Sequence, residues 1–131
     1  MNLEQEARRF MEDKGGSLTF DSYQKQAKKT AIYPKSADIM YPALGLTGEA
    51  GEVANKVKKI IRDKKIVRDG RENSPPDWRE QIAYELGDVL WYCAALASDL
   101  GLSLGRIATE NADKLSGRKE RGTLGGSGDS R

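Results

Sequence analysis

Residues 45–63, GLTGEAGEVANKVKKIIRD, predict a long amphipathic helix. At about 100° per residue, its apolar residues fall on one arc. They are Leu46, Val53, Val57 and Ile60. Glu49 and Glu52 lie along the edge of this arc, and Lys56 and Lys59 continue the same stripe. Glycine in a helix costs roughly 1 kcal/mol relative to alanine, so the three glycines at the start of this segment require an explanation.

A second segment, residues 78–100, repeats the pattern. Its ELGDV at 85–89 matches EAGEV at 49–53 and has the same phase relative to its own apolar arc. That arc consists of Ile82, Val89, Cys93, Leu96 and Leu100. Acids three residues apart project from the same side of a helix. If the two helices pack antiparallel, the acid pairs can therefore converge; they are Glu49, Glu52, Glu85 and Asp88.

Four converging carboxylates would repel one another at the edge of an apolar interface. Some of them must then take up protons, or a divalent cation must neutralise them. Mg²⁺ prefers oxygen ligands and commonly retains substrate phosphates, so the set is a candidate site for phosphate chemistry. Gly45, Gly48, Gly51 and Gly87 lie beside or inside the acid pairs. A missing Cβ would let a neighbouring helix or a ligand approach closely.

The remaining segments predict an all-α fold, because no segment shows the alternation of a strand. Helices are expected at residues 1–12, 22–30, 43–63, 78–100 and from 104 to 115 or 118. Asp21 and Ser103 are expected to cap their helices, and Asp77 is expected to form a capping box with Glu80. Gly101 should end the helix before it. Irregular segments are expected between Tyr33-Pro34 and Tyr41-Pro42 and in the charged, Pro- and Gly-containing loop 63–77.

The composition suits one domain whose core is small. Only 37% of the 131 residues are hydrophobic and 7% are aromatic. We therefore expect an antiparallel helical bundle completed by homo-oligomerisation, as a dimer or a tetramer. We expect residues 1–121 to form a single domain and residues 122–131 to form a glycine-rich C-terminal tail.

The residue types limit the chemistry and the setting. The chain has no histidine, which excludes Ser-His-Asp catalysis and His-ligated zinc. Cys93 is expected to be a small buried apolar residue, and a lone cysteine fits a cytoplasmic setting. No segment predicts a membrane span. The net charge of +2 and a basic run without interleaved aromatics do not favour a nucleic-acid partner.

The acid-bearing segments resemble the MazG-like all-α nucleoside triphosphate pyrophosphohydrolases. The signature of that family is Glu-x-x-Glu followed by Glu-x-x-Asp on the next helix, here Glu49, Glu52, Glu85 and Asp88. A later NADKLSGRKERG resembles the family's Asn-x-x-Lys-Leu element and a following arginine. In this chain those positions are Asn111, Lys114, Leu115 and Arg118. The resemblance spans residues 20–121.

The resemblance implies hydrolysis of a (deoxy)nucleoside triphosphate to the monophosphate and pyrophosphate, with Mg²⁺ or Mn²⁺ held by the four acids. Glu49 or Glu52 would accept the proton of the attacking water. The residues that would bind the substrate are Lys56, Lys59, Asn111, Lys114 and Arg118. The family's role would be control of the nucleotide pool, and its members act as dimers or tetramers. The base selectivity is left open, with Tyr23, Tyr33, Trp91 and Tyr92 as aromatics able to stack on a base.

Two other functions remain open from the sequence. Hydrolysis of phosphoribosyl-ATP is carried out by enzymes that share the all-α fold. A non-catalytic helical oligomer associated with nucleic acid would leave the acids as a solvated helix face. The nucleotide on which the protein acts, if any, distinguishes the three functions.

Overall fold

The computed structural model describes residues 2–14, 16–63 and 77–129, and all of its regular elements in these ranges are helical. The five α-helices confirm the predicted all-α class. They are α1 (Leu3–Lys14), α2 (Phe20–Lys28), α3 (Met40–Arg62), α4 (Trp78–Asp99) and α5 (Leu104–Glu120), with a 3₁₀ turn, η1, at Lys35–Ala37. The loop expected at 63–77 lies, apart from its two ends, outside the described residues.

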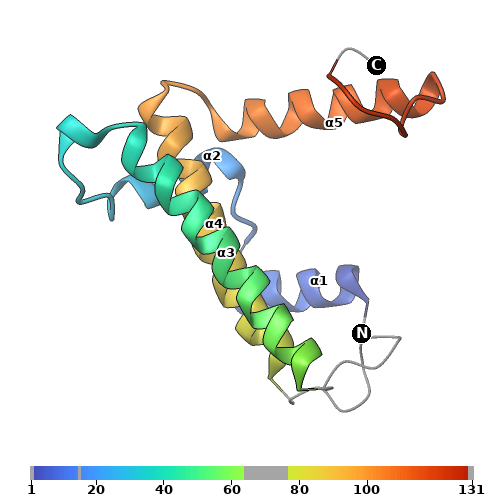
Figure 1. Ribbon diagram of the computed structural model, residues 1–131, viewed down its shortest axis with the longest axis horizontal. Helices are drawn as coiled ribbons and strands as arrows, with labels where there is room; N and C mark the ends of the chain where they lie inside the picture. The colour runs from blue at the N-terminus through green and yellow to red at the C-terminus, as the bar shows by residue number, and fades with distance from the viewer. Residues whose placement is uncertain (1, 15, 64–76, 130–131) are drawn as a thin grey trace.

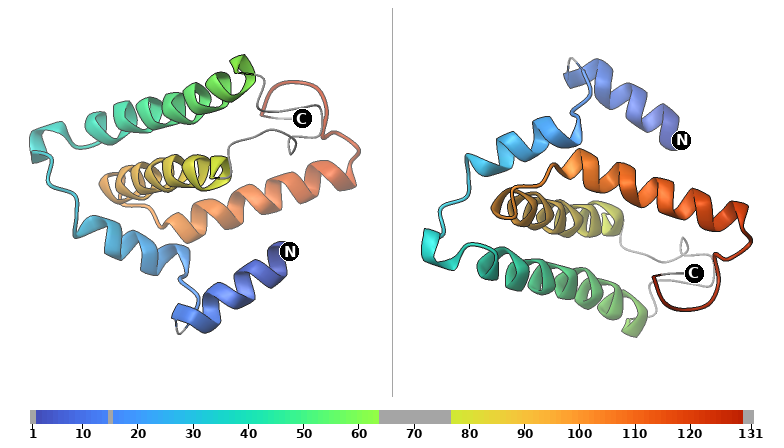
Figure 2. Two further views of the ribbon diagram at one scale, coloured as in Figure 1. Left: turned by 90° about the horizontal axis from the view of Figure 1, so that it is seen from below. Right: turned by 90° about the horizontal axis from the view of Figure 1, so that it is seen from above.

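The longest helices, α3 and α4, run antiparallel and side by side along most of their length (Figure 1). α2 and the start of α5 pack against α4. α1 lies at the outer edge of the molecule (Figure 2). In the described part of the chain, no helix is both long and apolar enough to cross a bilayer.

The predicted apolar arcs face the interior, with one exception. Leu46, Val53 and Val57 are half-buried and Ile60 is buried, and the α4 arc is half-buried as far as Leu96. Leu100 is 49% exposed, because it follows the last helical residue of α4. The structure adds a second contact face on α4 that the arc did not include. Small residues there pack against α2 and the start of α5; the cluster is Ala27, Ala94, Ala97 and Leu104.

The predicted start of α2 is wrong, and so is the capping predicted for α4, although α4 begins at Trp78 as expected. α2 begins at Phe20, and its first turn is capped by Thr19, whose Oγ1 accepts a hydrogen bond from the Ser22 amide at 3.1 Å. Asp77 is the residue before α4, but its side chain forms no capping box with Glu80. Its carboxylate instead accepts a hydrogen bond from the Gln81 side chain at 2.7 Å. The Gln81 side chain thus takes the place of the backbone amide that a capping box would use.

Asp21, expected to cap its own helix, instead holds the start of α5. Its Oδ1 accepts hydrogen bonds from the Ser103 hydroxyl at 2.7 Å and from the Gly105 amide at 3.1 Å. The Ser103 bond, followed by the Gly105 bond, lowers the pKa of Asp21. The carboxylate also lies at the N-terminal end of α5, where the helix dipole favours negative charge.

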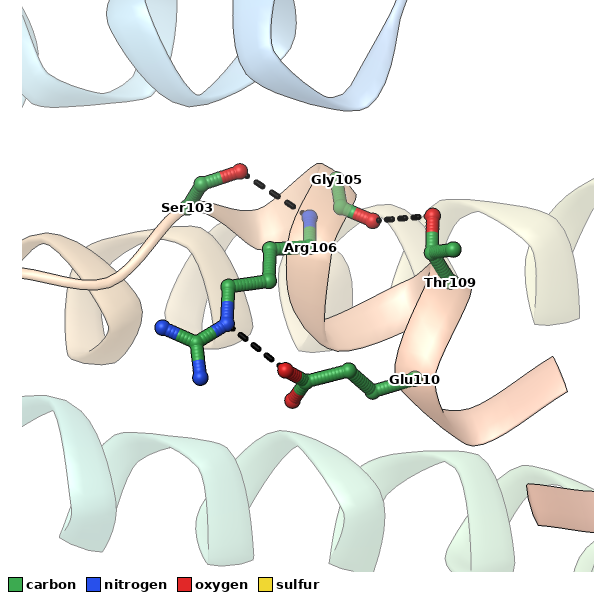
Figure 3. A network of polar contacts seen from close by, with 5 residues as sticks. All are labelled: Ser103, Gly105, Arg106, Thr109 and Glu110. Carbon is green, nitrogen blue, oxygen red and sulfur yellow. Dashed lines mark hydrogen bonds and ion pairs between the residues drawn. The ribbon is translucent and has the colours of Figure 1, made fainter. Parts of the chain in front are cut away.

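The first turn of α5 is built as predicted from Ser103 (Figure 3). Its Oγ accepts a hydrogen bond from the Arg106 amide at 2.9 Å. One turn later, Arg106 pairs with Glu110 at 2.7 Å, and the Thr109 hydroxyl donates to the Gly105 carbonyl at 2.9 Å. The preceding helix ends where expected, because Gly101 adopts a φ of +68° and the Leu102 amide bonds back to the Ala97 carbonyl.

The connection from α2 to α3 is fastened to α4 by Asp99. Its Oδ2 accepts hydrogen bonds from the Tyr33 hydroxyl at 2.9 Å and from the Ile39 amide at 3.0 Å. Ile39 has φ 68° and ψ −52°, and the Met40 amide bonds to the Asp38 carbonyl at 2.8 Å. This is a γ-turn of the strained kind, which the Asp99 contact helps to hold.

The start of α3 also departs from the expectation of an irregular segment up to Tyr41-Pro42. The helix begins at Met40, so both residues lie in its first turn. Proline is tolerated there because the first amides of a helix have no partner within it. The buried Pro42 ring compensates for the poor helical preference of the residue before it.

Close packing explains the presence of Gly45, one of the early glycines of α3. A Cβ at this position would overlap the ring of Tyr92 on α4, so glycine is required for the close approach of the two helices. The interpretation that a missing Cβ permits close approach is thus confirmed for Gly45. A Cβ at Gly48, Gly51 or Gly87 would meet nothing within 4 Å in this protomer.

We predict that Gly45→Ala lowers the free energy of unfolding by about 1–3 kcal/mol, because it forces the Tyr92 ring away from α3. Gly48→Ala, in the same helix but facing open space, should raise it by about 0.5–1 kcal/mol through better helix propensity. Denaturant unfolding of both variants measures the difference. Equal effects of the two substitutions would contradict the packing role of Gly45.

A second prediction concerns alkaline stability. Burial, followed by the hydrogen bond to Asp99, raises the pKa of Tyr33 to about 12. The folded state therefore holds the phenol proton more tightly than the unfolded chain, so the free energy of unfolding should fall as the pH rises from about 10 to about 12. Tyr33→Phe should be less stable at neutral pH by about 1–2 kcal/mol and should show a shallower alkaline decline. A decline as steep as that of the wild type would contradict this assignment.

Candidate metal and nucleotide site

Three carboxylates converge where α3 faces α4. Glu49 on α3 and Glu85 and Asp88 on α4 each place one carboxylate oxygen within 4.8 Å of the others. All three residues are half-buried. The convergence follows from the antiparallel packing, since Glu85 and Asp88 are three residues apart on one side of α4 and Glu49 faces them from α3.

The acid cluster brings several negative charges close together. Desolvation, followed by the negative charges of Asp88, Glu85 and Glu52, raises the pKa of Glu49. The repulsion can be relieved by a bound proton or by a cation. The all-oxygen donor set fits a hard divalent cation such as Mg²⁺.

Lys56 already provides one positive charge at the cluster. Its Nζ lies 3.1 Å from Glu85 Oε1, and both side chains are largely shielded from solvent. Lys56 lies seven residues after Glu49, two turns along the same face of α3. This placement agrees with the stripe predicted from the sequence, and it puts an ammonium group beside the carboxylates.

Glu52 lies outside the group of three. Its side chain is exposed on the outer side of α3, beside an open depression of about 450 Å³ whose lining includes Gly48, Gly51 and Lys58. Three residues turn a helix by about 300°, so the two acids of α3 differ by about 60° in direction. Glu52 is nevertheless close enough to raise the pKa of Glu49. Its role as a metal ligand stays a prediction.

A cavity of about 340 Å³ adjoins the cluster, which is within the usual range for small-molecule pockets. It is lined by Thr30, Glu49, Asp88, Trp91 and Tyr92. The Trp91 Nε1–H donates a hydrogen bond to the Thr30 hydroxyl at 2.8 Å, and the Trp91 and Tyr92 rings meet edge to face at 5.0 Å. The carboxylates therefore have fixed aromatic rings as direct neighbours.

Thr30 was not found from the sequence, where it appeared only as the last residue of a predicted helix. No local pattern indicates that its hydroxyl reaches Trp91, sixty-one positions later. The other aromatics proposed for base stacking have different surroundings. Tyr33 stacks on Tyr41 at 4.7 Å, and Tyr23 packs against the alanine-rich core.

The structure does not bring the predicted residues of α5 to the acid cluster of the same protomer. Asn111 and Lys114 are exposed, and the distal half of α5 runs away from the α3–α4 pair (Figure 1). Arg118 is buried, and its Nη2 donates to the carbonyl oxygen of Asp129 at 3.0 Å. Lys59 is exposed on α3.

Comparisons with known proteins identify the family of the chain. The family model of the MazG nucleotide pyrophosphohydrolase domain matches residues 42–123, which include the whole acid cluster and α5. The "Gene 37 protein" of Mycobacterium phage L5 is 48% identical over 117 residues, covering 85% of this chain and 97% of the phage protein. No solved structure matches the chain. The paired acids, the helical fold and these matches agree, and the chain belongs to the MazG nucleotide pyrophosphohydrolase family.

Proposed function

We propose that the protein hydrolyses a (deoxy)nucleoside triphosphate to the monophosphate and pyrophosphate, using Mg²⁺ or Mn²⁺, and so controls a nucleotide pool. The observation that carries this proposal is the convergence of Glu49, Glu85 and Asp88 beside an aromatic cavity. Membership of a nucleotide pyrophosphohydrolase family supports the reaction class.

The cation would be held by Glu49, Glu85 and Asp88, with Glu52 completing the set after a change of rotamer. Its fit is supported by the close spacing of the three oxygens and by the raised pKa of Glu49, which desolvation causes first and the neighbouring carboxylates second. When bound, the cation would supply the positive charge that attracts the triphosphate and offsets the charge developing on its oxygens.

Glu49 is the residue we propose as the proton acceptor. Its carboxylate lines the cavity beside the aromatic rings, where the substrate is proposed to lie. Glu52, the second candidate from the sequence, is more exposed and less constrained. Neither histidine nor a cysteine nucleophile is available at the site, so direct attack by water is the simplest route.

Lys56 is proposed to bind the phosphates. Its ammonium group lies at Glu85 and can reach either the carboxylate or a phosphate oxygen by rotation of a flexible side chain. Lys59, Asn111, Lys114 and Arg118 remain proposed substrate contacts. Because the distal half of α5 runs away from its own cluster, its contacts to substrate would be made at the cluster of another copy.

The base is proposed to occupy the cavity beside Trp91 and Tyr92. The Thr30 hydrogen bond fixes the Trp91 ring, and a fixed ring loses little entropy when a base stacks on it. The cavity is close enough to Glu49 and Asp88 for one ligand to contact both the aromatic rings and the acids.

We predict that Glu85→Gln and Asp88→Asn each lower turnover of the preferred triphosphate by about 10²-fold or more, because charge stabilisation is lost, while helical circular dichroism is retained. Glu110→Gln, which removes an exposed acid paired with Arg106, is the matched control and should keep its activity. Near wild-type turnover in both cluster variants would place the site elsewhere.

The bond that breaks is tested by incubation of the wild type with each nucleotide and Mg²⁺ in ¹⁸O-labelled water. We expect pyrophosphate as a product and the label in the nucleoside monophosphate, because water attacks the α phosphorus. Nucleoside diphosphate and orthophosphate as the products would contradict the proposed reaction. Turnover of phosphoribosyl-ATP and of no other nucleotide would show that the proposed substrate class, the nucleoside triphosphates, is wrong.

We also propose that the protein is a homodimer or homotetramer with a helical interface. Large apolar side chains remain exposed in the single chain, with Leu44 and Tyr84 both at 75%. Light scattering at micromolar concentration should give an oligomer, and Leu44→Lys with Tyr84→Lys should shift the equilibrium toward the monomer by removing apolar surface. A stable, active wild-type monomer would contradict the proposal.

A further inference from the structure

Arg118, near the end of α5, is the one charged residue of the described chain with a buried side chain. The glycine-rich tail, described as far as Asp129, covers it. Its Nη2 donates to the carbonyl oxygens of Gly128 at 3.4 Å and Asp129 at 3.0 Å, and it lies 3.7 Å from the Asp129 carboxylate. Every acceptor of this guanidinium that the structure records belongs to the tail.

The tail returns to Arg118 because its glycines adopt backbone conformations that other residues rarely adopt. Gly122 has a φ of +68°, which ends α5, and the Thr123 amide then bonds to the Arg118 carbonyl at 2.8 Å. Gly126 and Gly128 have φ values of +84° and +91°. These two later turns bring the carbonyls of Gly128 and Asp129 to the guanidinium.

The closed arrangement satisfies Arg118 only in part. Its Nε is buried and has no hydrogen-bond partner. The Asp129 carboxylate is fully exposed to solvent, so its pairing with the guanidinium at 3.7 Å is weak. A buried charge with an unfilled donor is unfavourable, and it leaves the tail in competition with any better acceptor.

We propose that the tail is an intramolecular latch that competes with a polyphosphate for Arg118. The inference rests on the proposed function, in which Arg118 binds the triphosphate or the leaving pyrophosphate. A phosphate group offers two oxygens in the geometry of the guanidinium fork and can fill both Nε and Nη2. The tail already occupies Nη2, so the tail and a phosphate bound through this fork cannot use Arg118 at the same time.

The latch can be opened without touching the acid cluster. A Cβ at Gly128 meets nothing within 4 Å, and Gly128→Val adds backbone strain at a φ of +91°. Gly125→Ala is the matched control, because Gly125 lies in the same tail, has no positive φ and also faces open space.

The first measurement reports opening directly. Phenylglyoxal modifies accessible arginines, and mass spectrometry compares Arg118 with the exposed Arg106 in the same full-length chain. We expect modification of Arg118 to be slow in the wild type and in Gly125→Ala and about tenfold faster or more in Gly128→Val. Equal rates in all three proteins would overturn the latch.

The second measurement reports competition. Gly128→Val should lower KM for the preferred triphosphate several-fold with little change in kcat, and Gly128→Val combined with Arg118→Ala should lose that gain. A faster modification of Arg118 with an unchanged KM would reduce the tail to a structural cover and overturn the proposal.

Failure of the proposed function gives a different result. If no nucleotide is turned over by any of the proteins, the reaction class is wrong, and the latch is judged by protection alone. Pyrophosphate should then protect Arg118 from phenylglyoxal at a lower concentration in Gly128→Val than in the wild type. Absence of protection in both proteins would overturn the latch as well.

Discussion

The close approach of α3 to α4, where the Tyr92 ring lies against the backbone at Gly45, is the contact on which the rest of the structure depends. It sets the spacing of the two helices that carry the acids, and it fixes Tyr92 at the edge of the adjoining cavity. A side chain at position 45 would separate the helices next to the cluster. One glycine therefore links the packing of the fold to the geometry of the site.

The same approach of α3 to α4 creates an electrostatic penalty at the acid cluster. Desolvation, followed by the charges of the nearby carboxylates, raises the pKa of Glu49, and among the described residues only Lys56 is paired with an acid of the cluster. An arrangement of this kind is unfavourable for stability and favourable for binding a cation, because the cation removes the repulsion. On another face of α4, small alanines are buried in the core. Their packing supports the helix that carries two of the three acids.

The polar contacts between helices show why the connections hold their places. Asp21 and Gln24 on α2 fasten the start of α5, and Asp99 on α4 fastens the segment that leads into α3. In each case a side-chain oxygen accepts a hydrogen bond from a backbone amide, which would otherwise need another partner. Within the described residues, no such hydrogen bond joins the distal half of α5 to α3 or α4, and its buried Arg118 bonds to the tail instead.

The sequence by itself determined the helical class, the course of α3, α4 and α5, and the phase of the acids relative to the apolar arcs, because periodicity and helix ends are local properties. Only the tertiary structure decided which acids meet. Glu49 joins Glu85 and Asp88 while Glu52 stays exposed, since a rotation of about 60° on α3 separates the facing side from the edge. The tertiary structure also showed that Asp21 binds the start of α5 instead of capping its own helix, and that Thr30 bonds to Trp91. Partners more than sixty positions apart in the sequence leave no local signal.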